Sequence, residues 1–178
     1  MMKGKQNLFI GIVALTMVGC TQYSPSVYRG FPKEFTLAYE EIYGHCYDSI
    51  PYSVVALDLY SEGLELDSTH HIKGTGYNLY LSDIFVPDSL LEEGLYSSDT
   101  TAQPFTFLPG RDYEGTPQGM YLLNIEEDKV IQIQVLDSGS FIYRNDSLLF
   151  ILYYHNTYGY KYTYTSHFQG TLIPWVKQ

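Results

Sequence analysis

The sequence predicts an all-β domain, either an antiparallel β-sandwich or a small barrel of about nine or ten strands. Short stretches in which apolar and polar residues alternate recur along the chain, separated by Gly, Asn, Asp and Pro. No stretch shows the 3.6-residue apolar period of an amphipathic helix. A chain of 178 residues with 17% charged residues suits one globular domain and not a disordered segment.

The expected strands follow one another at short intervals from residue 34 onwards. Asp137-Ser138-Gly139 and Asn145-Asp146 are typical of hairpin turns, whereas Pro109-Gly110 and Pro117 indicate a longer loop. The alternating segments are 34–42, 52–60, 76–82, 93–98, 104–108, 119–124, 130–136, 139–144, 147–154 and 159–173, the last interrupted near Gly170.

Two of these segments also predict how their faces are buried. In 130–135 the side chains of Ile131, Ile133 and Val135 share one face, which is typical of a strand half in water. Segment 147–154 is apolar on both faces. We therefore expect it to lie deep in the domain or to offer its outer side to another surface.

The first residues are typical of a bacterial export signal. Two lysines precede an apolar run from Leu8 to Val18, which is too short to span a bilayer as a helix but suits a signal peptide. Met17-Val18-Gly19-Cys20 resembles the lipobox of bacterial lipoproteins. The resemblance implies that residues 1–19 are a lipoprotein signal peptide. It also implies that Cys20 carries lipid in the form of diacylglycerol and palmitate.

The remaining chain divides into a lipidated N-terminus and tether, 20–33, and a single all-β domain, 34–178. Because Thr21 and not Asp follows Cys20, the analogy with lipoprotein sorting favours the outer membrane, with the periplasmic or surface face left open. The membrane is thus an expected partner through the lipid. The net charge of −10 opposes binding to nucleic acid.

The cysteine, histidine and acidic residues predict no catalytic or metal chemistry. If Cys20 carries lipid, Cys46 has no disulfide partner, and we expect it to be a buried, inert thiol. We expect 67–71, with its adjacent histidines, to be a solvated hairpin turn and not a metal site. Motifs of serine hydrolases and zinc proteases are missing from the sequence, so we expect no enzyme and no cofactor.

Tyrosine is unusually frequent, with nineteen residues. A regular strand through 158–164 would place alternate tyrosines on one face. Such a row could stack against sugar rings, or it could pack into the core with its hydroxyls at the edge. The candidate ligand-binding residues are Tyr158, Tyr160, Tyr162 and Tyr164.

Five triplets consist of Asp, then Ser or Thr, then an apolar residue or Thr. The triplet resembles the O-glycosylation sequon of Bacteroidota envelope proteins. Asp-Ser and Asp-Thr are also turn formers, which leaves a structural interpretation open. The candidate acceptors are Ser49, Ser68, Ser89, Thr100 and Ser147.

The order of strand and turn motifs resembles that of small secreted β lipoproteins of Bacteroidota. The resemblance implies a calycin-like barrel or a sandwich, and it carries no catalytic residue. It rests on 73–81, 93–96, 105–110, 136–141 and 162–172.

Two functions follow from these observations. The first is a non-catalytic binding module for a glycan or a small apolar ligand. The second is a structural or assembly accessory that docks on an outer-membrane protein through segment 147–154. A pocket lined by tyrosines would favour binding, and a broad apolar outer patch would favour docking.

Overall fold

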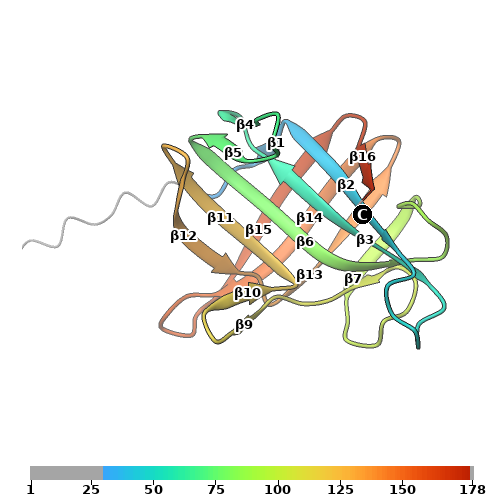
Figure 1. Cartoon of the computed structure of the whole chain (residues 1–178). Coiled ribbons are helices and arrows are strands. Elements are labelled where there is room, and N and C mark those ends of the chain that lie inside the picture. The colour runs from blue at the N-terminus through green and yellow to red at the C-terminus, as the bar shows by residue number, and fades with distance from the viewer. Residues whose placement is uncertain (1–29, 177–178) are drawn as a thin grey trace, which may run out of the picture. The chain divides into compact units, whose positions relative to one another are not determined.

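Strands make up the regular structure of residues 30–176, the part of the chain that the computed structural model describes (Figure 1). These residues contain no helix, which confirms the all-β prediction. The strands are β1 (Glu34–Phe35), β2 (Leu37–Gly44), β3 (Ser53–Tyr60), β4 (Leu64–Leu66), β5 (Ile72–Gly74), β6 (Gly76–Val86), β7 (Gly94–Ser98), β8 (Thr106–Phe107), β9 (Arg111–Tyr113), β10 (Thr116–Gln118), β11 (Met120–Glu126), β12 (Lys129–Val135), β13 (Ser138–Arg144), β14 (Ser147–His155), β15 (Lys161–Gln169) and β16 (Ile173–Val176).

Twelve of the strands form one mixed sheet. Its order is β1-β15-β14-β13-β7-β8-β6-β3-β2-β16, with β11 also paired to β6 and β12 paired to β11. The prediction of antiparallel pairing is too narrow, because β1 with β15, β7 with β8 and β16 with β2 are parallel. The pairs β4–β5 and β9–β10 are separate hairpins that the alternation in the sequence did not predict.

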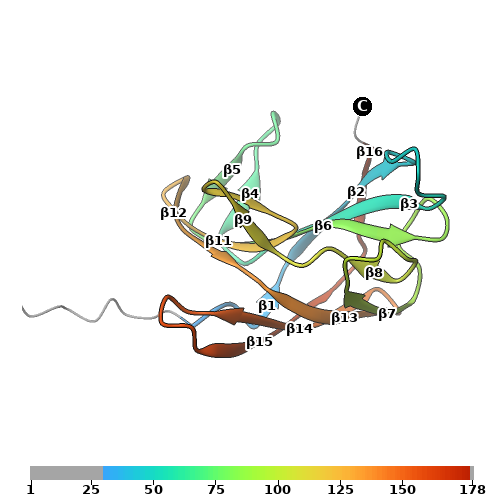
Figure 2. The same ribbon diagram turned by 90° about the horizontal axis from the view of Figure 1, so that it is seen from below.

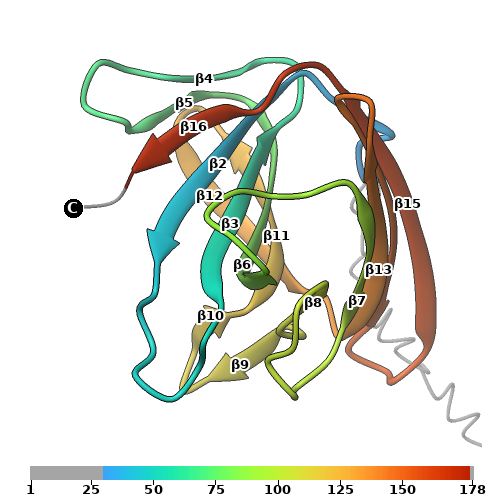
Figure 3. The same ribbon diagram turned by 90° about the vertical axis from the view of Figure 1, so that its right-hand side faces the viewer.

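The large sheet curls until its two halves face each other, as in a half-closed barrel (Figures 2 and 3). The first layer consists of β2, β3, β6, β11, β12 and β16, and the second layer of β1, β7, β13, β14 and β15. The short strand β8 joins the layers by pairing with β6 on one side and β7 on the other. The fold therefore lies between the two predicted architectures.

Strand β6 changes partner halfway along its length. Its first half, from Gly76 to Leu81, pairs with β11, and its second half, at Ile84 and Phe85, pairs with β8. The backbone between these halves is irregular, since Asp83 has a φ of 51°. A bulge of this kind bends a strand and increases its twist, so the irregularity turns the sheet towards the second layer.

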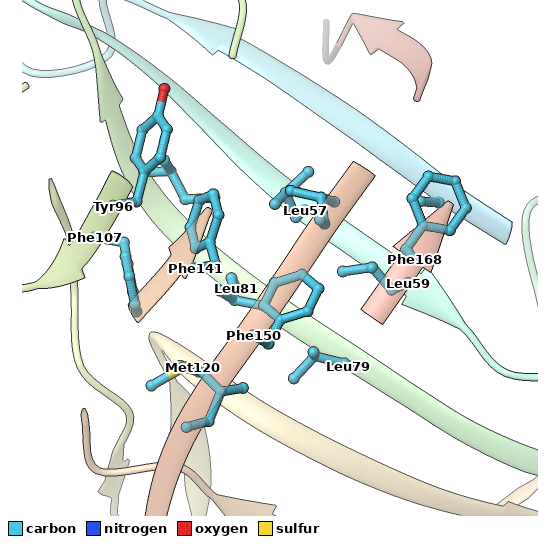
Figure 4. Packing of buried hydrophobic residues seen from close by; sticks show 14 of the residues in the cluster. Leu57, Leu59, Leu79, Leu81, Tyr96, Phe107, Met120, Phe141, Phe150 and Phe168 are labelled. Atoms are coloured by element: carbon cyan, nitrogen blue, oxygen red, sulfur yellow. The ribbon is translucent and has the colours of Figure 1, made fainter. Parts of the chain in front are cut away.

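Side chains from both layers interdigitate in one hydrophobic core (Figure 4). Leu57, Leu81 and Phe107 come from the first layer and β8, and Phe141 and Phe150 come from the second. The rings of Phe141 and Phe150 lie 5.6 Å apart, and that of Phe141 lies 5.4 Å from Phe107. Residues 30–176 contain no disulfide, so burial of these side chains is the main stabilising contribution to the domain.

Replacing Phe150 by Ala should therefore lower the free energy of unfolding by about 3–5 kcal/mol, through lost burial and the cavity left behind. The neighbouring Ile151 points outwards and is 40% exposed, so Ile151→Ala should cost about 1 kcal/mol or less. Urea denaturation of both variants measures the difference. Equal losses would mean that the two faces of β14 are not assigned correctly.

A buried carboxyl group holds the loop that closes one end of the core. This loop, residues 87–93, crosses between the layers and inserts Leu91, which is only 7% exposed (Figure 3). The backbone N–H of Leu91 donates to the carboxylate of Glu40 on β2, and that of Glu92 donates to the hydroxyl of Tyr96 on β7. Burial raises the pKa of Glu40 above its ordinary value of 4.5.

Because this pKa is raised on folding, the folded state binds a proton that the unfolded state has already lost, and stability falls as the pH rises through the window above 4.5. Glu40→Gln keeps an oxygen that accepts from Leu91 and removes the charge. Its stability relative to the unchanged protein should therefore increase from pH 4.5 towards neutral pH in urea titrations. The exposed Glu65→Gln serves as control, and a difference that does not vary with pH would contradict the assignment.

Candidate functional site

A tyrosine-lined groove lies on the outer face of the first layer, where β6 changes partner. One hollow has a volume of about 450 Å³, and Tyr47, Tyr80 and Tyr121 are among the residues that line it. A second hollow of about 250 Å³ adds Tyr43. The two share Tyr47, Ser82 and Asp83. The strands bring together tyrosines that are far apart in the sequence.

The groove is created at the fork in the sheet, the point at which β6 changes its partner from β11 to β8. The backbone of Ser82 bonds to Gly119 before β11, and the carbonyl of Asp83 accepts from Leu108 after β8. At Gly119, φ is +72°, and a Cβ there would lie 2.3 Å from the carbonyl oxygen of Pro109, so glycine is required. The backbones of Pro109 and Gly119 thus approach each other closely, and both residues line the larger hollow.

Two carboxylates bind the tyrosine hydroxyls of the groove. Glu41 accepts from Tyr43 at 2.7 Å and from Tyr80 at 3.1 Å, and the two phenolic oxygens lie 3.2 Å apart. Asp83 accepts from Tyr47 at 2.5 Å and from Ser82 at 2.9 Å. Glu41 is 3% exposed, so this network is built into the surface and does not form by chance contact of mobile side chains.

The hydrogen bonds fix what the groove can offer to a ligand. A tyrosine hydroxyl has one proton to donate and lone pairs that accept. Tyr43, Tyr47 and Tyr80 direct their protons within the network, to the carboxylates or to each other. Their remaining capacity, like that of the Asp83 carboxylate, which lines both hollows, is to accept. This part of the groove therefore favours a ligand that donates hydrogen bonds.

These hydroxyls keep their protons over the physiological pH range. Burial raises the pKa of Tyr43 and of Tyr121 to about 12. The pKa of Tyr80 is also raised, mainly by burial. The pKa of Tyr47 is raised mainly by its hydrogen bond to Asp83. The tyrosine hydroxyls are therefore neutral near neutral pH.

Aromatic faces complete the site. The rings of Tyr80 and Tyr121 lie 5.3 Å apart at an angle of 31°. Arg111, on the β9–β10 hairpin, is a cationic residue of the lining, and its Nε donates to Gln118 at 3.1 Å. The left-handed conformation of Asp83 is uncommon for a residue other than glycine, and such strain occurs often at functional sites.

The predicted tyrosine row is divided between a turn and a strand. Strand β15 begins at Lys161, so Tyr158 and Tyr160 lie in the preceding turn, 83% and 67% exposed. Tyr162 is 44% exposed at the start of the strand, and Tyr164 is buried and donates to the carbonyl of Pro32. The four side chains do not form one continuous surface because the turn interrupts the period of two.

Several other sequence predictions can be placed. Cys46 is exposed in the loop after β2, so the prediction that it is buried was wrong. The turn at 67–71 is exposed as predicted, but the ring of His70 stacks on that of Trp175 at 4.4 Å. The predicted lipidation residue, Cys20, lies outside the described residues.

The candidate glycosylation residues all lie at turns. Four of them are exposed, and the fifth is partly buried in the first position of β14. Asp67 and Asp99 accept from backbone N–H groups two residues further along the chain, as turn-forming Asp residues do. This geometry suits both interpretations of the triplets. The residues are Ser49, Ser68, Ser89 and Thr100, with Ser147 in β14.

Two strands, β12 and β14, expose large apolar side chains on their outer faces. On β12, Ile131 and Ile133 are 53% and 46% exposed, because this strand pairs only with β11 and no layer covers it. On β14, one face is core, and Leu149 and Ile151 on the other face point outwards, which is the second of the two predicted arrangements.

Comparison with known proteins finds no family model that matches the chain, no similar curated protein and no similar solved structure. Within residues 30–176 no helix is long and apolar enough to cross a membrane. The same residues hold no cluster of three or more His, Cys, Asp or Glu side chains that could bind a metal.

Chemical nitration with peptide mapping can test the division of the tyrosine row. Tyr158 and Tyr160 should react first, Tyr162 more slowly, and Tyr164 only after unfolding, because reagent access follows exposure. Uniform reaction of the four residues in the folded protein would contradict the burial of Tyr164.

Proposed function

We propose that this protein is a lipid-anchored lipoprotein of the outer membrane that acts as a non-catalytic binding module for a glycan. Lipid on Cys20 would hold the chain to the membrane after removal of residues 1–19. The groove formed by Tyr43, Tyr47, Tyr80 and Tyr121 would bind the ligand, in place of the row at 158–164.

The observation that carries this proposal is the hydrogen-bond arrangement of the groove. Sugars have many hydroxyl donors around a ring with an apolar face. The carboxylate of Asp83 and the lone pairs of the tyrosine hydroxyls would accept from such donors, while the buried Glu41 orients the hydroxyls of Tyr43 and Tyr80. The neighbouring rings of Tyr80 and Tyr121 offer an aromatic surface beside the acceptors. Acceptors next to aromatic faces are what a sugar ring requires.

The same arrangement disfavours a small apolar ligand. An apolar molecule in the larger hollow would cover Asp83 and Arg111 without replacing the water that hydrates them. Covering charged groups without new hydrogen bonds is unfavourable. The groove also favours ligand binding over a purely structural role, because a docking surface needs no network of this kind.

Replacing Tyr121 by Ala should weaken glycan binding by about tenfold, since an aromatic contact of this type contributes about 1–1.5 kcal/mol. Binding can be measured by calorimetry after screening the full-length protein against arrayed cello-, xylo-, malto- and chito-oligosaccharides. Tyr113→Ala is the matched control, because Tyr113 is 60% exposed on β9 but is not among the residues that line the groove. Equal effects of the two variants, or no glycan bound, would contradict the proposal.

A further inference from the structure

The tip of the β14–β15 hairpin lies beside the point at which the folded domain begins. The ring of Phe31 packs edge-on against Tyr154 at 5.1 Å and Tyr164 at 5.2 Å. The hydroxyl of Tyr164 donates to Pro32, and the N–H of His167 donates to Lys33. The start of the domain is therefore fixed to β14 and β15.

The tip presents aromatic rings to the outside on a well-ordered turn. The side-chain oxygen of Asn156 accepts from the N–H groups of Tyr158 and Tyr160, both at 3.0 Å. The backbone of Asn156 also bonds to Tyr160 and Gly159. Although the backbone is held in this way, Tyr158 is 83% exposed and Tyr160 is 67% exposed. Two large aromatic rings are thus exposed to solvent on an ordered turn, although burying them would stabilise the fold.

The charge of this hairpin differs from that of the rest of the chain. Segment 147–169 contains no Asp or Glu, although the protein has twenty acidic residues and a net charge of −10. Lys161 is exposed next to the turn, with its Nζ 4.3 Å from the centre of the Tyr153 ring. The facing carboxylate, Asp137, is bound to His155 at 2.6 Å. The hairpin therefore contributes a cation and no acidic residue of its own, and the one carboxylate facing it here, Asp137, is paired with His155.

We propose that the tyrosine tip, defined as Tyr153, Tyr158, Tyr160, Lys161 and Tyr162, inserts into the headgroup layer of the membrane that carries the lipid anchor. This inference rests on the proposed lipid at Cys20. Only ten residues lie between Cys20 and Phe31, and a chain of that length spans at most about 40 Å. This tether joins the domain beside the tip, which favours this end for the contact with the bilayer.

The chemistry of the tip suits that layer. Tyrosine is enriched at membrane interfaces, where its ring lies among apolar groups and its hydroxyl stays hydrated. Lysine extends its charge towards anionic headgroups, whereas acidic residues would be repelled. Leu149 and Ile151 add exposed apolar side chains on the outer side of β14. The contact would orient the domain, with the tip towards the lipid.

A tryptophan placed in the tip can report this contact. The full-length chain, processed in a lipoprotein-producing host, carries Tyr160→Trp in a Trp175→Phe background and is reconstituted into vesicles of phosphatidylethanolamine and phosphatidylglycerol with brominated acyl chains. Its emission should shift to the blue and be quenched by the bromine. The matched control is Leu90→Trp in the same background. Leu90 is 47% exposed, in the loop between β6 and β7 at the opposite end of the domain from the tip, and should stay unquenched (Figures 1 and 2).

A second pair of variants tests the charge. Lys161→Glu on the tryptophan reporter should reduce the quenching by more than half in vesicles that contain phosphatidylglycerol, and Lys161→Arg should leave it unchanged. Circular dichroism of each variant confirms that the fold is kept.

The other outcomes overturn the inference in distinguishable ways. If the protein floats with vesicles but the tryptophan at position 160 stays solvent-like, the tip contact is wrong, and the lipid anchor stands. If the protein does not float and Cys20→Ala behaves identically, the anchor is wrong and the contact with it. Shielding in native outer membranes but not in pure lipid would assign the tip to a membrane protein. Glycan binding by the groove is measured separately and is unaffected by these results.

Discussion

The change of partner along β6 is the constraint on which the rest of the domain depends. One edge of β6 pairs first with β11 and then with β8, and its backbone is irregular where the partners part, at Ser82 and Asp83. Because β8 also pairs with β7, the fork carries the sheet from the first layer to the second. Without it the two layers would have no hydrogen-bonded connection through β8, and the core between them would be open on that side.

The fork also explains why the groove lies where it does. Ser82 and Asp83 lie between the part of β6 that pairs with β11 and the part that pairs with β8. Both residues line the two hollows. Residues that arrive there from other elements, Tyr47 from the β2–β3 loop and Tyr121 from β11, are held by the same sheet that forms the core. A left-handed Asp83 is unfavourable by itself, and its bonds to Tyr47 and Ser82 compensate for that strain.

The curled sheet has two outer faces with different chemistry. The outer face of the first layer combines carboxylates with tyrosines in a recessed network, whereas the outer side of the β14–β15 hairpin has no acidic residue and ends in exposed tyrosines. This asymmetry separates the two proposed contacts in space: a glycan in the groove, and lipid headgroups at the tip next to the start of the domain. The orientation proposed for the domain leaves the groove free to bind while the protein is anchored.

The sequence by itself determined the fold class and most strand positions, because a period of two is a local property that each strand shows independently. It did not reveal the groove, since the four tyrosines and two carboxylates come from 41–47, 80–83 and 121 and converge only through pairing. It also did not predict that Tyr158 and Tyr160 lie outside the strand, or that Cys46, Ile131 and Ile133 are exposed. Alternation shows which side chains share a face, but only the neighbouring strands and layers decide whether that face is covered.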